Sequence, residues 1–213
     1  MDFYYKEELI HLLPQKAAYL PKYQLLIVAD LHLGKASHFR KAGIMIPSPK
    51  ISVDLERMNE LIADYNPAKV VFLGDLFHSS FNNEWEEFRG FLQQYPDIQF
   101  ILTKGNHDIL PLSVVQDTSL TLVDEYEVGE KLLLTHDLKE PAEDGRLIIS
   151  GHIHPGVLIK SKGRQSYRLP CFYYQNGNLI LPAFGQLTGL HLLKKKAGAK
   201  VFPVFGDEVI ALP

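Results

Sequence analysis

The stretch that best indicates the organisation of this chain is Ile98-Gln99-Phe100-Ile101-Leu102-Thr103-Lys104-Gly105-Asn106-His107-Asp108. Its first half is mostly apolar and predicts a buried strand. Its second half places an amide oxygen, an imidazole and a carboxylate directly after that strand. Alone, Gly105-Asn106-His107-Asp108 could be an ordinary turn, because Gly and Asn favour positive φ. The same arrangement recurs elsewhere in the chain, however, and the recurrence indicates a functional site.

Four other apolar runs are followed by polar residues of the same kinds. In chain order, Leu25–Val28 precedes Asp30-Leu31-His32, Val70–Leu73 precedes Gly74-Asp75, Leu132–Leu134 precedes His136, and Leu147–Ile149 precedes Gly151-His152-Ile153-His154. Continuous apolar runs are typical of strands covered on both faces, and open α/β sheets carry their sites at the carboxyl ends of such strands. Five strand ends with metal-type ligands are therefore expected to meet.

The order of the predicted elements suggests an α/β (α+β) domain with two stacked mixed sheets. Helices are predicted over 51–65, with Ser52 as the N-cap, and over 84–95; with the first three buried strands they give a βαβαβ half. The second half is mostly short strands, and Gln175-Asn176-Gly177-Asn178 predicts a hairpin turn. The first twenty residues are expected to form an edge strand or hairpin. Residues 1–213 are expected to be one domain with helices outside the sheets.

The composition, the net charge and the number of cysteines exclude several classes of protein. An apolar fraction of 46% and a charged fraction of 22% are ordinary for a globular protein, and a net charge of -3 gives no overall attraction to nucleic acid. The single cysteine, Cys171, excludes an internal disulfide. No apolar run approaches the ~20 residues needed to cross a bilayer, and the N-terminus has no signal-peptide pattern. We expect a cytoplasmic protein that does not bind membranes.

The polar residues at the strand ends are suited to holding metal ions. They are Asp30, His32, Asp75, Asn106, His136, His152 and His154. Oxygen and nitrogen donors without thiolates suit Mn, with Fe, Zn, Ni or Co as alternatives. Seven ligands are too many for one ion and right for two, and the carboxylate of Asp75 could bridge them. Two ions ~3.5–4 Å apart clamp the attacking and leaving oxygens of an in-line displacement at phosphorus and supply hydroxide at neutral pH. The pattern predicts a phosphoesterase.

The five motifs together resemble those of the calcineurin-like metallophosphoesterases, in the same order. The resemblance implies a sandwich of two mixed sheets flanked by helices, in four layers, with a dinuclear centre. It implies that Asp30, His32, Asp75 and His154 hold the first metal, and that Asp75, Asn106, His136 and His152 hold the second. It also implies that His107 contacts the phosphate and protonates the leaving oxygen, with Asp108 orienting it.

Further stretches resemble the bacterial DNA ligase-associated metallophosphoesterases. They are Ala29–Lys35, Phe39-Arg40 with Gly43-Ile44, Gly74–Ser79, and Pro182–Gly185 with Thr188-Gly189. This resemblance implies a phosphodiesterase acting in DNA repair, with a DNA ligase or helicase as partners. The chain departs from the pattern at Leu190, where a second glycine is usual, and at Asp137, where the wider superfamily commonly has glycine.

The long connection after His32 contains the cations expected to contact the substrate. Lys35, Arg40 and Lys41 could follow the phosphates of a nucleic acid strand, which predicts weak, salt-sensitive binding without sequence preference. No arginine adjoins a ligand motif, so diesters are expected to be better substrates than monoesters. The run Lys194-Lys195-Lys196 is interpreted as a solvated turn, with a phosphate-facing role as the alternative.

Two other functions remain open from the sequence. One is a hydrolase of a small pyrophosphate or nucleotide-linked lipid, although no amphipathic insertion for docking on a membrane is visible. The other is a non-catalytic scaffold on the same fold, which the complete ligand set and His107 argue against. The sequence leaves the oligomeric state, the cleavage polarity and the native metal undetermined.

Overall fold

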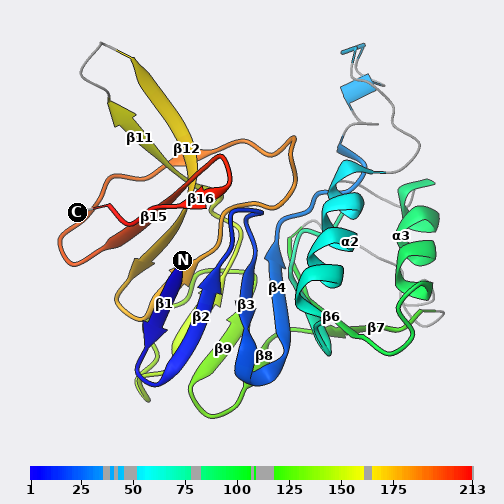
Figure 1. Cartoon of the computed structure of the whole chain (residues 1–213), viewed down its shortest axis with the longest axis horizontal. Coiled ribbons are helices and arrows are strands. Elements are labelled where there is room, and N and C mark those ends of the chain that lie inside the picture. Colours follow the sequence, from blue (N-terminus) through cyan, green and yellow to red (C-terminus); the bar gives the residue numbers. More distant parts are fainter. Residues whose placement is uncertain are drawn as a thin grey trace.

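Two β-sheets packed face to face, with helices on one outer side, form the structure, a computed structural model (Figure 1). It describes residues 1–35, 39–40, 43–45, 52–77, 83–106, 108, 118–160 and 165–212. In Figure 1, helices α2 and α3 lie at the opposite side of the molecule from strands β11, β12, β15 and β16. The predicted fold class of two stacked mixed sheets is confirmed, and within the described ranges the helices α2 and α3 flank one side of the sandwich.

The first sheet has seven strands in chain order. They are β1 (Asp2–Tyr5), β2 (Glu8–Leu12), β3 (Ala18–Leu20), β4 (Leu25–Ala29), β5 (Lys69–Leu73), β6 (Gln99–Thr103) and β7 (Leu120–Val123). Strands β1 to β4 pair antiparallel, as expected for an N-terminal hairpin, whereas β4, β5, β6 and β7 pair parallel. The carboxyl ends of β4, β5 and β6 therefore lie at one edge.

The second sheet has nine strands. They are β8 (Tyr126–Val128), β9 (Leu132–Thr135), β10 (Leu147–Ser150), β11 (Pro155–Lys160), β12 (Ser166–Gln175), β13 (Asn178–Ile180), β14 (His191–Leu192), β15 (Lys200–Phe205) and β16 (Glu208–Val209). Strands β9, β10 and β13 are parallel, so their carboxyl ends also share an edge. The predicted turn joins β12 to β13, with Asn176 and Gly177 at φ 49° and 73°. The short strands β8 and β14 were not predicted.

Helices α2 (Val53–Tyr65) and α3 (Asn83–Gln93) cover the first sheet, and the short 3-10 helix η1 (Pro21–Tyr23) precedes β4. Leu55, Met58, Leu61 and Ile62 form the buried stripe of α2, at helical spacing. Ser52 is the N-cap residue of α2, as predicted, but its hydroxyl makes no capping hydrogen bond. The Ser52 backbone N–H donates to Glu87 of α3 instead, and so ties the two helices together.

Alternation along the strands builds three apolar layers. In β4, Leu26 and Val28 face the helices, whereas Ile27 and Ala29 face the second sheet. A third cluster on the outer face of the second sheet includes Val157, Cys171, Tyr173, Ile180 and Val201. In the described ranges no helix covers this face, and partly buried residues such as Leu193 and Leu212 pack on it. None of the helices in those ranges has the length and apolarity needed to span a bilayer.

Candidate metal centre

The residues predicted from the strand ends meet at one place, where the carboxyl ends of the parallel strands of both sheets come together. Asp30 and His32 follow β4, Asp75 follows β5, His136 follows β9, and the loop after β10 contains His152 and His154. Backbone hydrogen bonds join these strand ends in pairs. The N–H of His32 donates to the Asp75 carbonyl at 2.9 Å, and the N–H of Gly151 donates to the His136 carbonyl at 3.2 Å.

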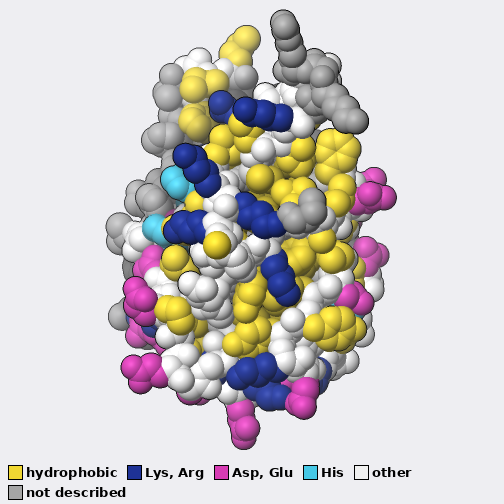
Figure 2. Space-filling view, turned by 90° about the vertical axis from the view of Figure 1, so that its left-hand side faces the viewer, with side chains coloured by type: hydrophobic (Ala, Val, Ile, Leu, Met, Phe, Trp, Pro, Cys, Tyr) yellow, Lys and Arg dark blue, Asp and Glu magenta, His cyan; other side chains and the backbone are white. Residues whose placement is uncertain are grey.

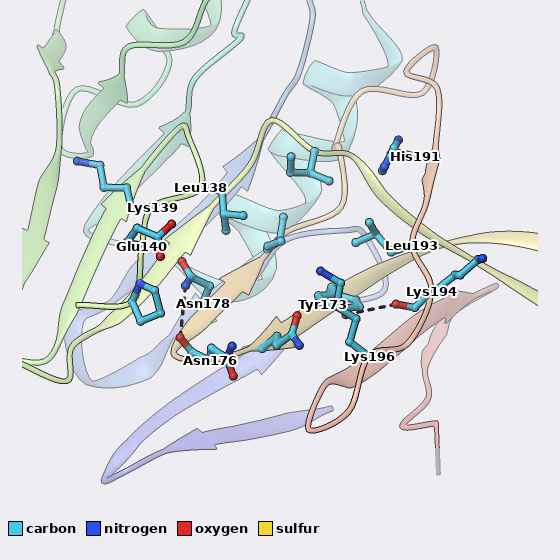
Figure 3. A pocket seen from close by; sticks show the side chains of 14 residues that line it. Leu138, Lys139, Glu140, Tyr173, Asn176, Asn178, His191, Leu193, Lys194 and Lys196 are labelled. Atoms are coloured by element: carbon cyan, nitrogen blue, oxygen red, sulfur yellow. Dashed lines mark hydrogen bonds between the residues drawn. The ribbon is translucent and has the colours of Figure 1, made fainter. Parts of the chain in front are cut away.

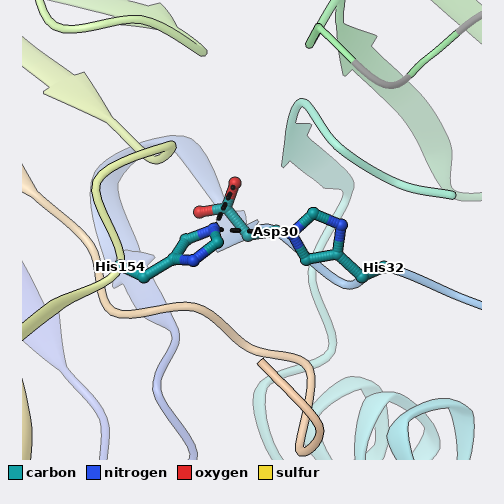
Figure 4. A group of neighbouring side chains, drawn as sticks. All are labelled: Asp30, His32 and His154. Atoms are coloured by element: carbon teal, nitrogen blue, oxygen red, sulfur yellow. Dashed lines mark hydrogen bonds and ion pairs between the residues drawn. The ribbon is translucent and has the colours of Figure 1, made fainter. Parts of the chain in front are cut away.

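Asp30, His32 and His154 form the first cluster (Figure 4). One ligand atom from each lies within 4.8 Å of the other two. His154 Nε2 is 3.4 Å from His32 Nε2 and 3.5 Å from Asp30 Oδ1. The carboxylate of Asp30 is fully buried, with 0% exposure. Figure 4 shows both rings directed toward the same space beside this carboxylate.

Asp75, His136 and His152 form the second cluster, again with one atom of each within 4.8 Å of the others. His136 Nε2 lies 3.0 Å from His152 Nδ1 and 3.6 Å from Asp75 Oδ1. Asp75 and His136 are buried, and the His152 side chain is more open, with 39% exposure. The second cluster is therefore the one that solvent reaches more easily.

Asp75 stands between the two clusters. Its Oδ1 faces His136 of the second cluster at 3.6 Å, and its Oδ2 is 3.9 Å from His32 Nε2 of the first. The two oxygens of one carboxylate thus point toward different clusters. This is the arrangement that a bridging carboxylate requires.

The backbone carbonyl of Leu73 determines which ring nitrogen of neutral His136 carries the proton. His136 Nδ1 lies 3.0 Å from the backbone carbonyl oxygen of Leu73, which can only accept a hydrogen bond. Nδ1 therefore carries the proton, and Nε2 presents its lone pair to Asp75 and His152. A ring nitrogen fixed in this way by the hydrogen bond of the other nitrogen is typical of a histidine metal ligand.

Asp30 also shapes the backbone of the loop after β10. The His152 N–H donates to both of its carboxylate oxygens, at 3.0 and 3.2 Å. A β-carbon on Gly151 would lie 2.7 Å from Asp30 Oδ2 and 2.9 Å from the Ala29 side chain. Only glycine allows this approach, so the Gly151-His152-Ile153-His154 loop is held against Asp30.

Backbone strain is concentrated at the candidate ligands. Left-handed φ values between 46° and 65° occur at Asp30, His32, Asp75, His152 and His154. Such conformations are uncommon for residues with a β-carbon and are a feature of functional sites. The left-handed residues are thus the same ones whose ligand atoms meet in the two clusters.

The comparisons with known proteins agree with this geometry. Residues 23–143 match the model of the calcineurin-like phosphoesterase family, which is more than half of the chain. The chain belongs to this family. It is therefore a metal-dependent phosphoesterase, and the non-catalytic alternative is not favoured. The match ends before Gly151, and the structure adds His152 and His154 to the same centre.

Solved structures with the same fold include that of Pseudomonas putida nuclease MPE. Its TM-score is 0.78 at 25% identity, covering 100% of this chain and 99% of that chain. A weaker likeness is to YfcE, a phosphoesterase from E. coli, with a TM-score of 0.46 at 15% identity, covering 88% of this chain and 96% of that chain. A comparison with curated proteins finds no match.

The other predicted residues of this calcineurin-like phosphoesterase lie as follows. Asn106 is exposed, directly after Gly105, whose added β-carbon would lie 2.5 Å from Asp75 Oδ1. Asp108 accepts the N–H of Leu76 and the N–H of Gly105, each at 2.9 Å. Burial raises the pKa of Asp108 above its usual value, against these hydrogen bonds. His107 lies outside the described residues, so its predicted contact with Asp108 stays a prediction.

The predicted substrate cations are only partly described. Lys35 is half-buried; burial lowers its pKa, while the charges of Asp75 and Asp30 act in the opposite direction. Arg40 is partly exposed, and Lys41 lies outside the described residues. Asp137, one of the two departures, is exposed, with Oδ1 3.7 Å from His152 Nδ1.

A support that the sequence did not reveal lies behind the first cluster. Arg57 of α2 donates to Asp54 Oδ1 at 3.2 Å and to the Phe184 carbonyl at 3.0 Å, and it stacks over the Phe184 ring. The N–H of Phe184 donates to the Ala29 carbonyl at 2.7 Å, and that of Gly185 to the Asp30 carbonyl at 3.2 Å. This network holds the backbone of Asp30 in place. In the sequence, the Pro182–Gly185 motif was the only sign of this support, and it did not indicate what these residues do.

Proposed function

We propose that this calcineurin-like phosphoesterase is a nuclease-type phosphodiesterase that uses two divalent metal ions. The observation that carries the proposal is the position of Asp75, whose two oxygens face two separate clusters of histidine and carboxylate at 3.6 and 3.9 Å. A single ion would not need ligands on both sides of one carboxylate. The first ion is assigned to Asp30, His32, His154 and Asp75, and the second to Asp75, His136, His152 and Asn106.

The donor set fits the proposed ions. It contains only nitrogen and oxygen donors, which suit Mn, and equally Fe, Zn, Ni or Co among divalent metals. The buried carboxylates of Asp30 and Asp75 also require compensating positive charge, since isolated buried ions are costly. Bound there, two divalent ions would lower the pKa of a water molecule and neutralise charge on the reacting phosphate. We propose Mn as the native metal.

The chain itself contributes positioning and proton transfer. The Leu73 carbonyl keeps the lone pair of His136 Nε2 directed into the centre, and Asp30 keeps the loop with His152 and His154 closed against it. We assign proton donation to the leaving oxygen to His107. Asp108, the next residue in the sequence, accepts the N–H groups of Gly105 and Leu76 and so ties its own segment to the end of β5.

The proposed substrate is a phosphodiester of nucleic acid. The support is the full-length likeness to a Pseudomonas putida nuclease, together with Lys35 beside the first cluster. Lys35, Arg40 and Lys41 are proposed to contact the phosphates of the strand. A role in DNA repair, with a DNA ligase or helicase as partners, belongs to the same proposal and rests on the sequence resemblance.

Metal content tests the centre directly. We expect about two ions per chain after reconstitution with Mn, and Asp75→Asn should weaken both sites because the bridging carboxylate loses its charge. Asp124→Asn is the matched control, because it makes the same chemical change at a surface carboxylate with 83% exposure. Elemental analysis that finds one ion or none in the wild-type protein would overturn the dinuclear assignment.

Substrate preference is tested by paired assays. We expect bis(p-nitrophenyl) phosphate to be cleaved far better than p-nitrophenyl phosphate, and chelation to abolish both activities. Replacing Lys35, Arg40 and Lys41 together by Ala should raise KM for an oligonucleotide and leave the small diester nearly unaffected. A preference for the monoester would contradict the phosphodiesterase assignment. An equal loss on both diesters would contradict the assigned role of the three cations.

A further inference from the structure

A cavity of about 460 Å³ lies on the outer face of the second sheet, away from the metal ligands themselves (Figure 3). Its floor is formed by Tyr173 of β12 and by Asn178 and Ile180 of β13. One wall is the segment Leu138–Pro141, and the other is the segment His191–Lys196. The proposed metal chemistry makes no use of this cavity.

Residues that line the cavity are close in sequence to the candidate metal ligands or are hydrogen-bonded to them. Ile153, which lines it, stands between the candidate ligands His152 and His154. Leu138, on one wall, follows His136 by two residues. On the other wall, the His191 N–H donates to the His154 carbonyl at 2.9 Å. The cavity and the metal centre therefore share the loop after β10 and the residues that follow β9.

A buried polar group without a donor lines the floor. Asn178 is 6% exposed, and its Nδ2 donates to the Asn176 carbonyl at 3.4 Å. Across the described residues, no group donates to its Oδ1. An acceptor buried in this way costs free energy unless something binds it. In Figure 3 the oxygen is directed away from Asn176 and toward the wall formed by Leu138 and Glu140.

The rim of the cavity is mainly basic. Lys194 and Lys196 are exposed there, and the Lys194 carbonyl accepts the Tyr173 hydroxyl at 3.4 Å. Lys139 is paired with Glu125, and Glu140 is the acidic residue in the lining. Figure 2 shows Lys and Arg side chains lying among hydrophobic ones on this side of the molecule, with Asp and Glu mainly around its edge. Such a surface complements a polyanion with apolar faces.

We propose that this cavity binds a nucleotide of the substrate strand next to the phosphodiester that is cleaved. The proposal rests on the nuclease function given above. The base packs against Leu138, Ile153 and Leu193, and its N–H edge donates to Asn178, since Asn side chains recognise base edges by hydrogen bonds. Lys194 and Lys196 contact the adjoining phosphates. The volume lies within the ~300–1,000 Å³ usual for small-ligand pockets.

The test compares an oligonucleotide with a substrate too small to reach the cavity. Binding of a fluorescein-labelled single-stranded oligonucleotide is measured by anisotropy in EDTA, over a range of salt concentrations. Hydrolysis of the oligonucleotide and of bis(p-nitrophenyl) phosphate is measured with Mn. The variants are Lys194→Ala/Lys196→Ala and Asn178→Leu. The control is Lys160→Ala/Lys200→Ala, which removes the same charge from exposed lysines that do not line the cavity.

We expect the cavity lysine variant to bind the oligonucleotide about tenfold more weakly, with a log–log salt slope shallower by about 1.4 for two phosphates of a single strand. The control should change binding by no more than about twofold. Asn178→Leu should weaken binding about three- to tenfold, as for loss of one hydrogen bond, with its folding checked by thermal unfolding. Hydrolysis of bis(p-nitrophenyl) phosphate should be unchanged in all of them.

Three results would overturn the proposal, and they are distinguishable. If the cavity lysine variant and the control variant weaken oligonucleotide binding equally, the lysines act only through nonspecific charge and the cavity is not a binding site. A loss of bis(p-nitrophenyl) phosphate hydrolysis in the cavity lysine variant would show that the segment supports the metal centre and binds no nucleotide. If the wild-type protein hydrolyses the small diester but neither binds nor cleaves oligonucleotides, the nucleic acid function fails, and the nucleotide site fails with it.

Discussion

Replacing Gly74 by Ala tests how tightly the strand ends are packed at the metal centre. A β-carbon on Gly74 would lie 2.2 Å from Nδ1 and 2.4 Å from Cγ of His136, far closer than any real contact. His136 is 1% exposed, and its Nδ1 is held by the Leu73 carbonyl at 3.0 Å, so the ring cannot move without losing that bond. Gly74 also has φ +66°, which disfavours any β-carbon.

The free-energy cost of the left-handed backbone and the cost of the clash with His136 can be estimated separately. The left-handed conformation costs roughly 1–2 kcal/mol for a residue with a β-carbon. Inserting a methyl group into a packed site costs about 1–3 kcal/mol more. We therefore expect Gly74→Ala to lower the free energy of unfolding by about 2–5 kcal/mol. Gly198→Ala is the matched control, because Gly198 has φ +76° and nothing within 4 Å, so it has only the first cost.

Urea denaturation gives the two free energies, and chelator competition gives metal affinity. Because His136 would be displaced from its carbonyl partner, affinity at the second site should fall about 10- to 100-fold, with the first site less affected. If Gly74→Ala is no more destabilising than Gly198→Ala and both metal affinities are kept, then His136 is not packed tightly against Gly74.

Three further outcomes are expected. His107→Ala should keep its metal content and lose about 10²–10⁴ in rate, with a smaller loss for esters with acidic leaving groups; lost metal would contradict the assignment. Arg57→Met leaves the partly buried Asp54 without its charged partner and should destabilise the protein by about 1.5–3 kcal/mol in urea denaturation, whereas Arg89→Met, which removes an exposed pair, should cost less than about 1 kcal/mol. Burial lowers the pKa of Lys16 to about 8 from 10.5, so between these pH values the unfolded chain binds more protons at this side chain than the folded chain does. The free energy of unfolding of the wild type, measured relative to that of Lys16→Met, should therefore rise with pH from about 8 to 10.5.

The parallel core and the candidate ligands can be predicted from the amino-acid sequence. Leu25–Ala29, Lys69–Leu73 and Gln99–Thr103 are strands because continuous apolar runs suit positions buried on both faces, and this signal is local. The residue types after each run limited the chemistry to nitrogen and oxygen donors. The structure then placed Asp30, His32, Asp75, His136, His152 and His154 within two adjoining clusters, as the order of the strands suggested.

Other features depend on contacts between distant segments and are visible only in the folded protein. The direction of the two Asp75 oxygens, the proton on His136 Nδ1 and the support of the Asp30 backbone by Arg57 through Phe184 all arise from contacts between residues far apart in the chain. The same is true of the cavity around Asn178, whose lining residues come from four separate segments. Periodicity and residue type report the environment of a single element. They do not report which elements meet, because that depends on how the two sheets pack and on backbone turns such as the left-handed one at Asp75.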